Sequence, residues 1–173
     1  MARSNVLIAD AGPLIALSRI GALDLPRGVF GEVWVTPEVR AEVLPRADYP
    51  GKADLAAAFE AGWLRDRTFP VTSWRPLNPG LGPGERSSIA AALQWPGCLL
   101  VIDDRAGRAE ARAWKVAIIG TAAVIGLAKL RGLIPAARPL LERLQPAGYF
   151  IGPAVIEAVL ADVGEAHEAN EAK

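Results

Sequence analysis

The stretch 6–17, VLIADAGPLIAL, constrains the fold of this chain more than any other part of the sequence. It begins with apolar residues, which is typical of a short strand buried on both faces of a parallel sheet. Gly12 permits a sharp turn and Pro13 suits the first position of a helix, so we expect a helix over about 13–20. Asp10 stands where the strand ends. The stretch therefore predicts a carboxylate at the sheet edge where open α/β folds bind ligands.

Short apolar runs and helical patterns continue to alternate along the chain, although Gly21 and Pro26 are expected to break the pattern. Further strands are expected at 33–35, 63–69, 98–102 and 116–119. Helices are expected after Thr36, over 52–61, from Glu85, and over 105–114, 122–131, 136–144 and 153–162. This alternation predicts an α/β fold with three layers, α/β/α, and a central parallel sheet of four to five strands. We expect one domain over 1–163 and a disordered acidic tail over 164–173.

The composition predicts a soluble cytoplasmic protein. The 173 residues are 51% hydrophobic and 22% charged, which is ordinary for a globular domain. The lone cysteine, Cys98, excludes a disulfide framework and is expected to pack in the core. Apolar runs are too short or too interrupted for a leader or a membrane span. Because 19 basic residues balance 19 acidic ones, any affinity for nucleic acid must come from a local basic patch.

Acidic residues recur where the predicted strands end and helices begin. Asp103 and Asp104 directly follow the most apolar strand, Glu85 opens a helix, and Glu42 lies beside the buried seam of another. Since the carboxyl ends of parallel strands share one edge, we expect these acids to converge with Asp10. Each has a structural alternative. Asp10 and one of the two adjacent aspartates could cap helices, Glu85 could complement a helix dipole, and Glu42 could be solvated.

Converging carboxylates need a counter-charge. Two like charges about 4 Å apart repel by roughly 4 kcal/mol at an effective dielectric constant near 20. Protons or divalent cations relieve this repulsion. Oxygen ligands without nearby His or Cys favour Mg²⁺ or Mn²⁺ over zinc, and such ions activate water against phosphodiesters. The sequence therefore predicts a metal-assisted hydrolytic site.

Basic residues follow the paired aspartates. Arg105, Arg108 and Arg112 lie at helical spacing, where they either form a rim for phosphates or pair with acids such as Glu110. His167 is the only histidine and lies in the predicted tail, so it is not expected to act as a general base. The segment 70–84 is rich in Pro and Gly, and its length suggests a functional loop.

The chain resembles the PIN-domain family over about residues 5–163, through VLIADAGPLIAL, LGPGE, IDDRAGR, IGT and AKLRGLIP in this order. PIN domains are three-layer α/β/α metal-dependent ribonucleases, many of them toxins of toxin–antitoxin pairs. The resemblance implies that Mg²⁺ or Mn²⁺ is held by four catalytic acids and one assisting acid, which are Asp10, Glu42, Glu85, Asp104 and the assisting Asp103. It also implies an RNA substrate contacted by Arg105 and Arg108, and a small antitoxin protein as partner.

The sequence departs from the toxin-type pattern at three positions. Gly12 replaces a Ser or Thr, so a supporting hydroxyl is absent. Glu85 stands one residue out of line with the usual acid, at whose position Arg86 lies, and Ser87 replaces a second glutamate. These departures leave open a catalytically weak or inactive RNA-binding or interaction domain. A phosphatase-like or nucleotide-binding protein ranks lower, because a glycine-rich phosphate loop is absent. Whether the protein is a monomer or a homodimer stays open.

Overall fold

The strand predicted from the opening stretch of the sequence is present as β1 (Val6–Ala9), and it lies at the centre of the sheet. The computed structural model describes residues 6–70 and 73–166, and these form a five-stranded sheet in the order β3-β2-β1-β4-β5. The other strands are β2 (Glu32–Val35), β3 (Leu64–Asp66), β4 (Leu99–Val101) and β5 (Ile118–Ile119). Every neighbouring pair is parallel. This arrangement confirms the predicted central parallel sheet.

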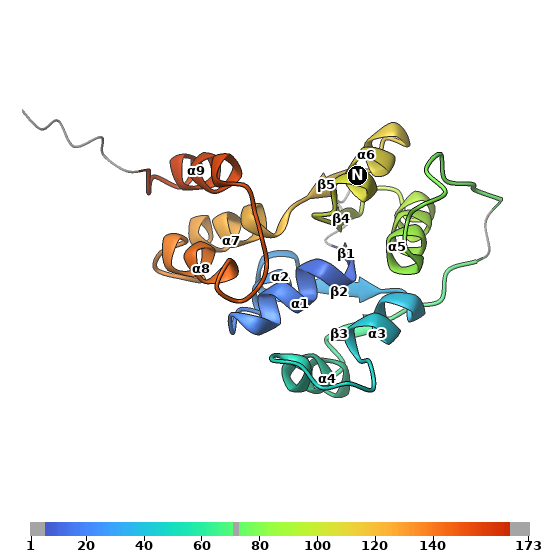
Figure 1. Ribbon diagram of the computed structural model, residues 1–173, viewed down its shortest axis with the longest axis horizontal. Coiled ribbons are helices and arrows are strands. Elements are labelled where there is room, and N and C mark those ends of the chain that lie inside the picture. Colours follow the sequence, from blue (N-terminus) through green and yellow to red (C-terminus); the bar gives the residue numbers. More distant parts are fainter. Residues whose placement is uncertain (1–5, 71–72, 167–173) are drawn as a thin grey trace, which may run out of the picture.

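Helices cover both faces of the sheet (Figure 1). They are α1 (Ala11–Arg19), α2 (Leu25–Phe30), α3 (Pro37–Val43), α4 (Lys52–Glu60), α5 (Pro83–Gln94), α6 (Arg105–Ala113), α7 (Thr121–Leu130), α8 (Arg138–Leu144) and α9 (Pro153–Asp162). Leu7 and Ala9 of β1 pack with α1, α3 and α7, whereas Ile8 packs with α5 and α6. Successive strand residues point to opposite faces, so the apolar run of β1 is buried on both sides. The three-layer α/β/α prediction is confirmed.

The predicted break is present at Gly21, which follows the end of α1 in a turn with a positive φ, but it was wrong at Pro26, because a short helix, α2, begins there. Pro26 occupies one of the first two helical positions, where the missing N–H would have no partner inside the helix. The proline therefore starts this helix and does not interrupt one. For the same reason α5 begins at Pro83, two positions before the predicted Glu85. Cys98 is buried, as predicted.

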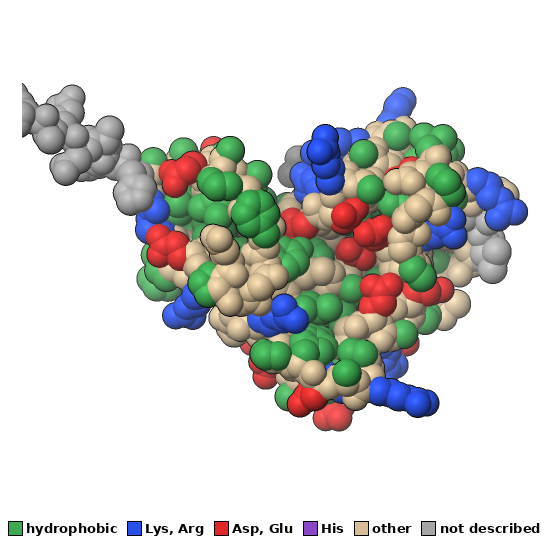
Figure 2. All heavy atoms as spheres, in the orientation of Figure 1, with side chains coloured by type: hydrophobic (Ala, Val, Ile, Leu, Met, Phe, Trp, Pro, Cys, Tyr) green, Lys and Arg blue, Asp and Glu red, His purple; other side chains and the backbone are tan. Residues whose placement is uncertain are grey.

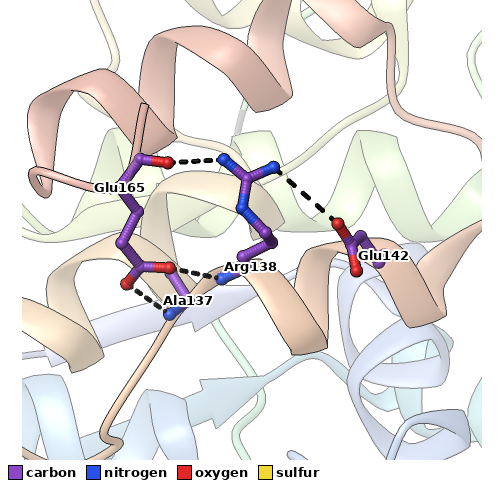
Figure 3. Close-up of polar contacts among 4 residues, drawn as sticks. All are labelled: Ala137, Arg138, Glu142 and Glu165. Carbon is purple, nitrogen blue, oxygen red and sulfur yellow. Dashed lines mark hydrogen bonds and ion pairs between the residues drawn. The ribbon is translucent and has the colours of Figure 1, made fainter. Parts of the chain in front are cut away.

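The end of the described chain is joined to the start of α8 (Figure 3). The Glu165 carboxylate accepts hydrogen bonds from the backbone N–H groups of Ala137 (2.7 Å) and Arg138 (2.9 Å). These bonds hold the pKa of Glu165 below its usual value. The Arg138 guanidinium donates to the Glu165 carbonyl and pairs with Glu142. Side-chain contacts of the domain thus continue past the predicted boundary at 163.

Residues 167–173, including His167 and most of the predicted tail, lie outside the described residues. Within the described ranges, none of the helices has both the length and the apolar character that crossing a membrane requires.

Candidate active site

A cavity of about 470 Å³ opens at the carboxyl ends of β1 and β4. All the acids singled out in the sequence line it, namely Asp10, Glu42, Glu85, Asp103 and Asp104. We call this cavity the acid pocket. Figure 2 shows acidic side chains gathered in a hollow of the molecule between the α7–α9 side and the α5–α6 side. The predicted convergence of these residues on one sheet edge is therefore present, because the sheet brings both strand ends to the same place.

Asp10 is the most buried of these acids, with an exposed fraction of 6%. It stands at the N-cap position of α1, yet its side chain makes no capping hydrogen bond. Its Oδ1 atom is buried without a hydrogen-bond partner among the described residues. Burial raises the pKa of Asp10 to about 7, although the Ala11 backbone N–H lowers it, and the charges of Glu85, Glu42 and Asp104 raise it further. Capping, the structural alternative for Asp10, does not account for this carboxylate.

The carboxylates of Glu42 and Glu85 both lie at the first turn of α5. Glu42 Oε1 accepts a hydrogen bond from the backbone N–H of Gly84 (2.9 Å), and Glu85 Oε2 accepts one from Gly82 (3.0 Å). The N-terminus of a helix favours negative charge, which helps to hold two carboxylates close together. Glu85 therefore has the helix-terminal role considered from the sequence and lines the cavity as well. Glu42 reaches the same turn from a different helix, α3.

The adjacent aspartates differ in their surroundings. Asp104 is exposed and caps α6, because its Oδ1 accepts from the Gly107 N–H at 2.8 Å. Asp103 Oδ1 accepts from the Thr121 N–H (3.0 Å), and Oδ2 accepts from the hydroxyl groups of Thr121 (2.5 Å) and Tyr149 (2.7 Å). Both oxygens of Asp103 are thus occupied at the start of α7. The inference that only one of the pair could cap α6 agrees with this geometry.

Tyr149 is a pocket residue that the sequence did not indicate. It lies between α8 and α9, 46 residues from Asp103, and burial raises the pKa of its phenol. A Cβ on Gly12 would lie 3.2 Å from the Tyr149 hydroxyl. Gly12 has no side-chain hydroxyl of its own, and its small size leaves room for the Tyr149 hydroxyl from a distant loop. The missing side chain at Gly12 was the only signal in the sequence.

The two arginines that were expected to contact RNA are in different environments. Arg105 is exposed and lines the acid pocket. Arg108 is half-buried and donates a hydrogen bond to the Ile102 carbonyl at 2.9 Å, next to the end of β4. Glu110, considered as a partner for these arginines, instead accepts hydrogen bonds from the backbone of Leu77 (2.7 Å) and Asn78 (2.9 Å). It therefore anchors the loop before α5.

The acids share a cavity without forming a compact ligand cluster. Among the described residues, no group of three or more His, Cys, Asp or Glu side chains lies close enough together to hold a metal ion. Mg²⁺ is commonly bound through one or two carboxylates and several waters, so a compact cluster is not required. The unpartnered Asp10 Oδ1 and the all-oxygen donor set fit such a hydrated cation. Asp103 fits less well, because both of its oxygens already accept hydrogen bonds.

A parallel sheet between two layers of helices, with an acid-lined cavity at its central strand ends, places this protein in the α/β class. The family model described as a PIN domain matches residues 6–165. The chain therefore belongs to the PIN-domain family, as its motifs predicted. PIN domains have a nuclease-like fold and generally use divalent metal ions. No curated protein and no solved structure gives a significant match.

Proposed function

We propose that this PIN-domain protein is a Mg²⁺- or Mn²⁺-dependent endoribonuclease that hydrolyses RNA phosphodiesters. The observation that supports it most is the buried Asp10 carboxylate, which has an unpartnered oxygen in a cavity shared with other acids. A buried carboxylate oxygen without a hydrogen bond or a counter-charge is costly in free energy. A site that retains one is better explained by a cation that binds there than by stability.

In this proposal the cation is held, directly or through water, by Asp10, Glu42, Glu85 and Asp104. A bound ion of this kind supplies activated water and compensates the negative charge that develops on the phosphate. In the absence of the ion, Asp10 is protonated below about pH 7, because burial raises its pKa to about 7. Glu42 and Glu85 are oriented by the first turn of α5, which limits how far either carboxylate can move.

The residues around these acids are assigned supporting roles. Arg105 contacts an RNA phosphate at the mouth of the acid pocket, where its side chain is exposed. Arg108 contributes mainly by holding the end of β4, because it already donates to the Ile102 carbonyl. Asp103 assists by tying the end of β4 to Thr121 and Tyr149. Membership of the PIN-domain family supports a biological role as a cytoplasmic toxin that a small antitoxin protein inhibits.

RNA cleavage in the presence of Mn²⁺ tests the proposal. We expect the wild-type protein to cut a mixed-sequence RNA, and the Asp10→Asn and Asp104→Asn variants to lose at least 99% of this rate. Calorimetric titration with Mn²⁺ in the absence of RNA provides a second measurement, in which heat of binding should disappear in Asp10→Asn. Equal cleavage by wild type and both variants would show that a contaminating nuclease is responsible and would remove the enzyme assignment.

A second candidate function is an RNA-binding or interaction domain with little catalytic activity. One observation favours it: Glu42, Glu85 and Asp104 each already use one carboxylate oxygen in a hydrogen bond to a backbone N–H. Such bonds stabilise the fold without a metal. If RNA binds with the same affinity in Mn²⁺ and in EDTA, and is not cut, this second function is the correct one.

A further inference from the structure

A second cavity, of about 480 Å³, lies on the other side of the first turn of α5. Pockets that bind small molecules have roughly 300–1,000 Å³, so this one has room for such a ligand. We call it the Trp74 pocket and define it by Arg67, Phe69, Trp74, Arg75, Arg86 and Ser87. It shares none of these residues with the acid pocket. Aromatic rings and arginines predominate in its lining, whereas five carboxylates line the acid pocket.

The arginines of the Trp74 pocket lack carboxylate partners among the described residues. The Arg67 guanidinium stacks over the Trp34 ring at 3.9 Å from its centroid, and Arg86 donates a long hydrogen bond (3.4 Å) to the Pro79 carbonyl. Among the described residues that line the pocket, Glu38 is the only acid. This surface therefore carries a local positive charge in a protein whose formal net charge is zero. It is the kind of basic patch that affinity for nucleic acid requires here.

Trp74 carries an unused hydrogen-bond donor. Its indole Nε1 is buried and has no acceptor among the described residues. Its ring is held edge-on against Trp114, with centroids 6.2 Å apart, and Trp114 in turn donates to Glu110. A buried donor without an acceptor is unfavourable in free energy, and a ligand that supplies an acceptor gains a hydrogen bond once the Trp74 ring shifts enough to expose the N–H. Phosphate and nucleobase oxygens are such acceptors, and aromatic side chains are the usual surfaces on which bases stack.

The two pockets adjoin along the same helices. Gly82 and Glu85 line the acid pocket, whereas Pro83 and Arg86 line the Trp74 pocket. On α3, Glu42 belongs to the acid pocket and Glu38 belongs to the Trp74 pocket. One helical turn rises about 5.4 Å, so the pockets are separated by little more than a turn of each helix. A single strand lying across the first turn of α5 would reach both.

We propose that the Trp74 pocket binds a nucleotide of single-stranded RNA whose neighbouring phosphodiester lies in the acid pocket. The choice of RNA rests on the proposed ribonuclease function. An acidic peptide would also satisfy the arginines. RNA is favoured because it supplies flat bases for Phe69 and Trp74 and a polyanionic backbone that continues toward the acid pocket.

Binding of a fluorescently labelled 12-nucleotide single-stranded RNA, measured by anisotropy in EDTA, tests this proposal without cleavage. Trp74→Phe removes the indole N–H and keeps an aromatic ring, and we expect it to raise Kd about fivefold, as expected for one lost hydrogen bond. Arg75→Gln removes an exposed charge that has no ion pair with another described residue. We expect it to weaken binding and to reduce the slope of log K against log salt by about 0.7.

Arg143→Gln is the matched control, because Arg143 is an equally exposed arginine on α8, outside both pockets. It should change neither Kd nor the salt slope. If Trp74→Phe proves unstable in thermal denaturation, the Kd and salt slope of Arg75→Gln alone test the proposal. The Arg75 side chain is exposed and does not support the fold.

The outcomes separate this proposal from the proposed function. If the wild type cleaves RNA and both variants bind RNA with unchanged Kd, the proposed role of the Trp74 pocket in RNA binding is overturned. The nuclease assignment then stays intact. Weakened binding by both variants without any cleavage in Mn²⁺ supports the pocket and overturns the nuclease. Binding of a labelled acidic peptide that depends on Trp74 and Arg75, with RNA binding independent of them, identifies a protein partner and overturns the RNA proposal.

Discussion

The carboxylate of Glu42 lies against the backbone of Gly84. Its Oε1 accepts the Gly84 N–H at 2.9 Å, and a Cβ on Gly84 would lie only 2.7 Å from the same oxygen. Real Cβ atoms essentially never approach another atom that closely. The second glycine of the LGPGE motif therefore admits a glutamate from α3 to the first turn of α5. This contact joins two helices that the sequence separates by 42 positions.

Gly84→Ala should impair the acid pocket while sparing the fold. The added methyl group pushes the Glu42 carboxylate away, because that carboxylate is the end of a flexible side chain. Alanine is a better helix former than glycine by about 1 kcal/mol, which offsets the lost hydrogen bond. We expect Mn²⁺-dependent RNA cleavage to fall at least tenfold, with the free energy of unfolding changed by no more than about 1 kcal/mol.

Gly152→Ala is the control for this substitution, since a Cβ there meets no atom within 4 Å. It should leave cleavage unchanged, and the poorer N-cap that alanine gives α9 should lower the free energy of unfolding by no more than about 1 kcal/mol. Full cleavage by Gly84→Ala would mean that the position of Glu42 does not matter for the activity.

Asp10 should make the metal-free protein less stable as the pH rises. Its pKa is raised from 3.8 to about 7 by burial. The folded state therefore binds the proton more tightly than the unfolded state, and stability is full below pH 4 and is lost as the pH rises through 7. One pKa unit corresponds to about 1.4 kcal/mol, so the loss is at most about 4 kcal/mol. Urea unfolding in EDTA between pH 4 and 8 measures it.

Asp10→Asn cannot ionise and should abolish this pH dependence. At pH 8 in EDTA we expect the variant to be more stable than wild type, while its RNA cleavage is lost. Parallel unfolding curves for the two proteins across this pH range would contradict the predicted ionisation of Asp10.

Substitution of Asp103 should mainly affect stability, whereas substitution of Asp104 should mainly affect activity. Asp103→Asn disturbs hydrogen bonds from Thr121 and Tyr149, so we expect it to lower the free energy of unfolding by about 2 kcal/mol. Asp104→Asn should change it by less than about 0.5 kcal/mol, because asparagine is an equally good N-cap. Cleavage should instead be lost in Asp104→Asn. Denaturant unfolding and cleavage rates measured on both variants test this difference.

Tyr149→Phe extends this test, since it removes the hydroxyl that donates to Asp103 and also hydrogen-bonds with the Thr121 side chain. We expect it to lower stability by about 1 kcal/mol, and to add little to Asp103→Asn because both changes act on one network. Strictly additive losses would show that Tyr149 and Asp103 act independently.

Glu110 should hold the loop before α5 in a pH-dependent way. Burial alone would raise the pKa of Glu110, but hydrogen bonds from the Leu77 and Asn78 backbone and from Trp114 bring it below its usual value. Because the pKa is lowered in the folded state, the stabilisation is present above pH 4.5 and is lost as the pH falls. Amide hydrogen-exchange protection of Leu77 and Asn78 should fall with it.

Glu110→Gln should reproduce the low-pH state at neutral pH. A glutamine amide cannot accept on both sides, so one backbone N–H loses its partner, at a cost of about 2 kcal/mol. The Leu77 and Asn78 amides of this variant should exchange faster at pH 7, whereas amides in β1 should keep their protection. Unchanged protection at Leu77 would contradict the anchoring role.

Much of the fold and part of the site were predictable because they depend on local sequence. The apolar run of β1 and the alternation of strands and helices were sufficient for the parallel three-layer sheet. The positions of Asp10, Asp103 and Asp104 followed, since a residue directly after a parallel strand must lie at its carboxyl edge. Pro26 was misread because a proline breaks a helix in its middle but suits its first turn, and only packing of α2 decides which.

By itself the sequence determined which carboxylates meet at the edge of the sheet. Only the tertiary structure decided that one oxygen of Asp10 has no hydrogen-bond partner among the described residues, that Tyr149 donates to Asp103, and that arginines and Trp74 form a second pocket beside the first. The physical reason is the range of the interactions. Strand and helix signals act over a few residues, whereas these contacts join segments that come together only when the helices pack on the sheet.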